Sequence, residues 1–168
     1  MQDDVIRQDE GSAVAYLIPA IIGGLIGALI GGAIWGAIAI FTKYQVGYVA
    51  LLVGFLAGGG VLLLGRKRGV PYQLIAVVMA ILGLAIGKYL TYYFLNRADV
   101  IEQFGQEAWD AAGLTLTSPQ MFEFFFADLG VLFEAIDILF IILAIVTAWG
   151  MPSNRVPAAK AVEKPAGT

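Results

Sequence analysis

The residues of this chain best suited to chemistry are three ionisable side chains within apolar stretches, Lys88, Glu134 and Asp137. An ionisable group at the centre of a bilayer costs about 2.5–3.5 kcal/mol on insertion scales, so such groups are expected to pair or to line a site. Lys88 lies eight residues before Asn96, where its apolar stretch ends. Asp137 lies eight residues after Leu129, where the next apolar stretch begins. Antiparallel helices would therefore place the lysine and the aspartate at one depth.

Three roles remain open for this charge cluster. Glu134 lies three residues before Asp137, a spacing that predicts one shared helix face. The cluster is a structural ion pair with a lysine that snorkels outward, a functional proton or cation site, or a contact for another subunit. One lysine cannot neutralise two carboxylates by simple pairing. The surplus acid must be protonated, reach outer water, or meet a cation or a partner's basic group.

Other kinds of chemistry find little support in the sequence. The chain has no cysteine and no histidine. Disulfides and thiolate metal sites are therefore excluded within it, and the commonest metal ligand and general base is missing. The run Gly58-Gly59-Gly60 lies inside an apolar stretch and lacks the lysine of a phosphate-binding loop. We expect no catalytic residues, no metal, no cofactor and no nucleic-acid partner, and we do not expect an enzyme.

The composition indicates a membrane protein. Hydrophobic residues make up 60% of the chain and charged residues 14%, whereas a soluble domain has roughly 45–50% and about 25%. About 20 apolar residues of helix cross the hydrocarbon core. The apolar runs do not alternate, so they predict helices rather than barrel strands. The predicted fold is an all-α membrane protein with four transmembrane helices in a bundle, at about 18–41, 46–65, 74–95 and 129–149.

The remaining segments are polar. We expect a polar cytoplasmic N-terminal tail over residues 1–12, one transmembrane domain over 13–150 and a flexible cytoplasmic tail over 151–168. An outer polar segment over 96–128 separates the third and fourth helices. In it, residues 98–111 predict an amphipathic helix that ends at Gly113, and Ser118-Pro119 predicts a second helix start.

Lysine and arginine predict the orientation. Two of them, Lys43 and Arg97, fall on one predicted side of the membrane, and more fall on the other: Arg7, Arg66, Lys67, Arg68, Arg155, Lys160 and Lys164. The positive-inside rule then places both termini in the cytoplasm. The basic turn Arg66-Lys67-Arg68 is a topology signal, and its alternative role is a contact with anionic lipid.

Glycines recur four residues apart in the first three predicted helices. The set is Gly23, Gly27, Gly31, Gly32, Gly36, Gly54, Gly58, Gly83 and Gly87. Small residues at this spacing let two helices approach closely in lipid. Packing within the bundle, a seam between identical copies, and a glycine-lined conduction path are the three interpretations.

Several segments resemble a group of small four-span bacterial membrane proteins without an assigned function. They are 31–35 (GGAIW), 44–50 (YQVGYVA), 54–61 (GFLAGGGV), 82–90 (LGLAIGKYL), 137–140 and 144–149. The resemblance spans about residues 21–149 apart from the outer segment. It implies a four-span fold and the inner membrane of a bacterium, and it implies no activity.

The leading hypothesis is a non-catalytic structural or accessory subunit of a bacterial inner-membrane assembly, packed through its glycine-rich helices. Its expected partners are the lipid bilayer and other membrane subunits, or further copies of itself. The alternative is a small proton or cation transporter or channel that uses Lys88, Glu134 and Asp137.

Overall fold

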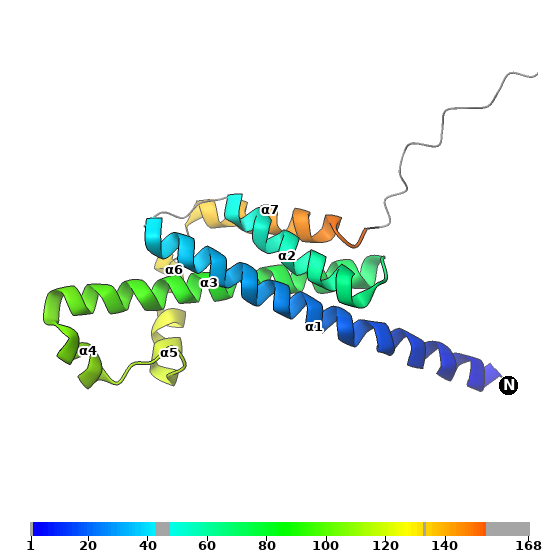
Figure 1. Ribbon diagram of the computed structural model, residues 1–168, viewed down its shortest axis with the longest axis horizontal. Helices are drawn as coiled ribbons and strands as arrows, with labels where there is room; N and C mark the ends of the chain where they lie inside the picture. The colour runs from blue at the N-terminus through cyan, green and yellow to red at the C-terminus, as the bar shows by residue number, and fades with distance from the viewer. Residues whose placement is uncertain (1, 43–47, 133, 154–168) are drawn as a thin grey trace, which may run out of the picture.

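The computed structural model describes residues 2–42, 48–132 and 134–153, with side chains from Ala15 onward. Within these ranges every regular element is a helix (Figure 1). The helices are α1 (Gln2–Thr42), α2 (Tyr48–Gly65), α3 (Val70–Phe104), α4 (Gln106–Ala112), α5 (Pro119–Ala127), α6 (Leu129–Leu132) and α7 (Ala135–Gly150). The predicted all-α class is confirmed. The loop expected after Thr42 and most of the C-terminal tail lie outside the described residues.

Three helices are long and apolar enough to cross a membrane. They are the Ala15–Thr42 part of α1, and helices α2 and α3. At about 1.5 Å of rise per residue, even the 18 residues of α2 nearly cover a hydrocarbon core about 30 Å thick. These helices indicate a multi-pass membrane protein.

The apolar stretch 129–149 does not form one continuous helix, so that part of the prediction is wrong. Helix α6 has only 4 residues, α7 has 16, and Glu134 between them is extended at φ −97° and ψ 162°. The physical reason is a local hydrogen bond: the Asp137 carboxylate accepts from the Glu134 backbone N–H at 2.8 Å. A carboxylate near a helix start satisfies an N–H group that has no helical partner.

Helix α3 continues past Asn96 and Arg97, where the sequence predicted its end. Asn96 is accommodated because its Nδ2 donates to the carbonyl of Tyr92, one turn back, at 2.9 Å. The helix stops at Gly105, whose φ of +86° favours glycine. The predicted amphipathic helix over 98–111 is therefore wrong: its first half belongs to α3 and its second half to α4.

Both predicted signals around α4 and α5 are confirmed. Helix α4 ends at Gly113, which is left-handed at φ +64°, and α5 begins after Ser118 with Pro119 at its first position. The Ser118 hydroxyl, however, donates back to the Thr115 carbonyl at 2.9 Å rather than capping α5.

Helix α1 begins at Gln2, and its first turns extend beyond the other helices (Figure 1). Residues 2–12 contain no proline and a single glycine, so little in this sequence stops the helix from continuing outward from its apolar part.

Helices α2 and α3 contact each other, and α1 and α7 each contact both of them. The interfaces are built from small side chains with no exposed surface, such as Ala57, Val61, Ala80 and Ala144. The large apolar side chains lie outside, among them Ile22, Leu63 and Val78. In water this arrangement would expose apolar surface, whereas in a bilayer it lets helices pack closely and presents the large side chains to lipid.

Candidate functional site around Lys88 and Asp137

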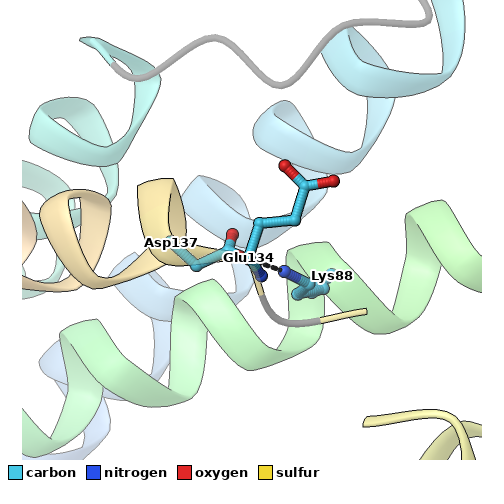
Figure 2. Close-up of polar contacts among 3 residues, drawn as sticks. All are labelled: Lys88, Glu134 and Asp137. Carbon is cyan, nitrogen blue, oxygen red and sulfur yellow. Dashed lines mark hydrogen bonds and ion pairs between the residues drawn. The ribbon is translucent and has the colours of Figure 1, made fainter. Parts of the chain in front are cut away.

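A buried ion pair joins α3 to α7. Lys88 Nζ donates to Asp137 Oδ2, and the two side chains are 12% and 5% exposed (Figure 2). The depth inferred from the apolar stretches is therefore realised as a direct contact. Each charge lies in a region of low dielectric constant, where an unpaired charge costs much more than a paired one.

The same carboxylate oxygen has a second role. Asp137 Oδ2 accepts the backbone N–H of Glu134 at 2.8 Å, and this bond fixes the first turn of α7. One oxygen thus receives a charged donor from a neighbouring helix and a backbone donor from its own. Moving or removing Asp137 changes both the contact between α3 and α7 and the place where α7 begins.

The side chain of Glu134 does not pair with Lys88. Figure 2 shows its carboxylate directed away from both Lys88 and Asp137, and the residue is exposed. The predicted common helix face is wrong, because Glu134 precedes the first turn of α7 and is extended. In the described part of the chain, the buried lysine therefore meets one carboxylate of the cluster, and the other lies at the surface.

A cavity of about 300 Å³ adjoins the ion pair, which forms part of its wall. Helices α1, α3, α5, α6 and α7 contribute the rest. Apolar and aromatic side chains dominate, including Trp35, Leu84, Ala85, Phe125, Phe126 and Ile141. An apolar pocket with a few placed polar groups is the usual form of a small-molecule site.

Helix α5 closes one side of this cavity, and hydroxyl groups from α3 hold it in place. Tyr92 donates to the Asp128 carboxylate at 2.6 Å, and Tyr89 donates to the Leu116 carbonyl at 2.6 Å. The Tyr89 ring stacks on that of Phe122, with 4.8 Å between centroids. The sequence did not predict these specific pairs, since nothing in its spacing relates α5 to α3.

The basic turn lies at the opposite end of the helices. Arg66, Lys67 and Arg68 are exposed. Arg68 donates to the Ser153 carbonyl at 3.0 Å, and the Lys67 ammonium lies 3.9 Å from the centroid of the Tyr16 ring. The turn is thus in contact with α1 and with the segment after α7.

All nine glycines of the predicted packing set face neighbouring helices of the same chain. A Cβ atom built on any of them would lie 3.0 Å or less from another atom. Real Cβ atoms essentially never approach another atom more closely than 3.0 Å. Gly23, Gly27 and Gly31 of α1 face α2. Gly32 and Gly36 of α1 face α3, and Gly87 of α3 faces α1. Gly83 faces both α1 and α2, and Gly54 and Gly58 of α2 face α7. At these positions the absence of a side chain lets the helices of one chain approach closely.

We compared the chain with protein-family models, with curated proteins and with solved structures, and none of the three comparisons finds a match.

Proposed function

We propose that this chain crosses the inner membrane of a bacterium four times, as a four-helix bundle with both termini in the cytoplasm. Contacts at the basic turn support this arrangement. Gly69 N donates to the Pro152 carbonyl at 3.0 Å, and Gln73 Nε2 donates to the Trp149 carbonyl at 3.1 Å. The end of α7 therefore lies beside the start of α3, so the two helices run antiparallel. At about 1.5 Å of rise per residue, the 16 residues of α7 cover most of a hydrocarbon core about 30 Å thick.

Within that bundle we propose a non-catalytic role, as an accessory subunit that binds a transmembrane helix of another protein. The observation that carries this proposal is a groove of about 410 Å³ along α1 and α2. Its lining includes Gly59, beside exposed apolar side chains such as Ile30 and Phe55. An apolar groove with a glycine in its wall suits a helix with a small residue at the contact, because the two backbones can then approach closely at that point.

Gly59 distinguishes this groove from the internal contacts. A Cβ atom at Gly59 would meet only Met151 Cε, at 3.6 Å, which is ordinary van der Waals contact. The fold therefore does not require glycine at this position, unlike Gly60, whose Cβ would overlap the backbone of α1. A residue without a side chain here keeps the groove open on the lipid-facing surface.

The polar groups within the membrane-crossing helices support a structural role over transport. Lys88 pairs with Asp137, and Gln73 bonds to a backbone carbonyl. The carboxylate of Glu134 points away from that pair (Figure 2). These groups stabilise contacts between helices. A transporter would need them to exchange partners during its cycle.

The test is purification of the tagged full-length chain from native membranes in a mild detergent. We expect a partner at fixed stoichiometry that Gly59→Leu loses and Ala33→Leu retains. Ala33 is exposed on α1 but does not line the groove, so its variant places the same leucine side chain elsewhere on the surface. Both variants should melt at the parent temperature.

Retention of the partner by Gly59→Leu would overturn the groove as the contact. Proton or cation flux through the isolated chain in liposomes, lost in Asp137→Asn, would instead support the transporter.

A further inference from the structure

The cavity beside the ion pair has a size that limits what it can hold. Its volume is about 300 Å³. A water molecule occupies about 30 Å³ of liquid, so the cavity takes roughly ten non-hydrogen atoms. That is one ring with a short substituent, and it is too little for a whole lipid. Its walls are apolar except for Lys88 and Asp137.

The Asp137 carboxylate has one oxygen to offer to such a ligand. Both hydrogen bonds that the described residues donate to it end on Oδ2. Oδ1 receives no hydrogen bond from the described residues, and Asp137 lines the cavity. An ionised carboxylate only accepts hydrogen bonds, so the ligand must supply the donor.

The charge balance selects the kind of donor. Lys88 already neutralises Asp137, so a cationic ligand would bring an unbalanced positive charge into an apolar site. An anion would likewise bring an unbalanced negative charge into the apolar site. A neutral hydroxyl group satisfies Oδ1 without adding charge.

We propose that this cavity binds a small lipophilic alcohol or phenol, a ring-sized apolar molecule whose single hydroxyl group donates to Asp137 Oδ1. The ring lies between the side chains of Trp35, Phe125 and Ile141, where aromatic contacts favour a flat apolar body. This site is independent of the groove on α1 and α2, and it does not rest on the proposed accessory role.

Trp35 provides a local reporter, because it lines the cavity and is only 6% exposed. The full chain with Trp109→Phe and Trp149→Phe, in lipid nanodiscs, leaves Trp35 as the single tryptophan. The probes are 4-bromophenethyl alcohol and 4-bromopropylbenzene, which match in size and differ in the hydroxyl group. Bromine quenches tryptophan at short range, and concentrations are compared as mole fractions in the bilayer.

We expect saturable quenching by the alcohol, with half-saturation at a concentration about tenfold or more below that of the hydrocarbon, as for a hydrogen bond to a charged group. Ala85→Phe, which fills the cavity wall, should raise the half-saturation concentration of both probes about tenfold. Ala33→Phe, outside the cavity, should leave it unchanged.

A second variant separates the cavity from the hydrogen bond. Lys88→Met combined with Asp137→Leu should still bind both probes but lose the preference for the alcohol. Quenching that rises linearly without saturation would overturn the site. So would equal binding of the two probes by the parent chain, or quenching unaffected by Ala85→Phe.

Discussion

Replacing Lys88 alone is expected to harm this protein more than replacing Lys88 and Asp137 together. Both side chains are nearly buried, at 12% and 5% exposed. Removing one member of a buried pair costs about 3–5 kcal/mol, because it leaves the other charge without compensation. Lys88→Met should therefore lower the free energy of unfolding by about 3–5 kcal/mol.

The double variant should lose less, since no charge is stranded. Replacing a whole buried pair by apolar residues of similar volume is often neutral or stabilising. In this chain Asp137 also receives the Glu134 N–H, and losing a helix cap costs about 0.5–2 kcal/mol. We therefore expect Lys88→Met with Asp137→Leu to cost about 1–2 kcal/mol. The gap of about 2 kcal/mol is roughly a 30-fold difference in the unfolding equilibrium.

The assay is unfolding in mixed micelles with increasing sodium dodecyl sulfate, followed by far-ultraviolet circular dichroism. Glu134→Gln is the matched control, since its side chain is exposed and directed away from the pair. It should change stability by less than about 0.5 kcal/mol and add simply to Lys88→Met. Additive costs for Lys88→Met and Asp137→Leu would refute the reasoning, because they would mean that the buried charges do not interact.

Three further predictions concern packing, the outer segment and topology. Gly60→Leu should lower the free energy of unfolding in detergent by about 1–3 kcal/mol, because the added side chain overpacks the contact with α1. Gly59→Leu should melt like the parent. Equal effects would contradict the distinction between the two glycines. Tyr92→Phe removes a hydrogen bond that holds α5, so it should cost about 1–2 kcal/mol and speed proteolysis within α5, whereas unchanged proteolysis would show that the aromatic contacts suffice. Cysteines at Val70 and Thr115, both exposed, should react with an impermeant reagent in intact cells only at Thr115, and the reverse pattern would invert the proposed orientation.

The sequence predicts the relative depth of Lys88 and Asp137 in the membrane better than it predicts where their helices begin and end. Depth follows from how many apolar residues separate a charge from the polar end of its stretch. That number is unaffected when α3 continues to Phe104 or when α7 begins late, at Ala135. The orientation of Glu134 was not predictable from spacing, because a hydrogen bond from its backbone to Asp137 replaces the helical conformation that the spacing assumes.

The cavity could not be predicted from the sequence for a different reason. Its wall brings together Trp35 of α1, Ala85 of α3, Phe125 of α5 and Ile141 of α7. None of these helices is adjacent in the chain to the next one in that list. Only the packed arrangement specifies which apolar residues share a wall, and an apolar residue in a membrane protein meets lipid or protein with the same local pattern.

The position where α7 begins depends on one carboxylate rather than on a helix-breaking residue. Residues 129–137 contain no proline, and the extended conformation at Glu134 is held by its N–H bond to Asp137. Without that acceptor, the Glu134 N–H would lose its side-chain partner at the start of α7. The break between α6 and α7 therefore depends on Asp137. The carboxylate that pairs with Lys88 also holds Glu134 in its extended conformation.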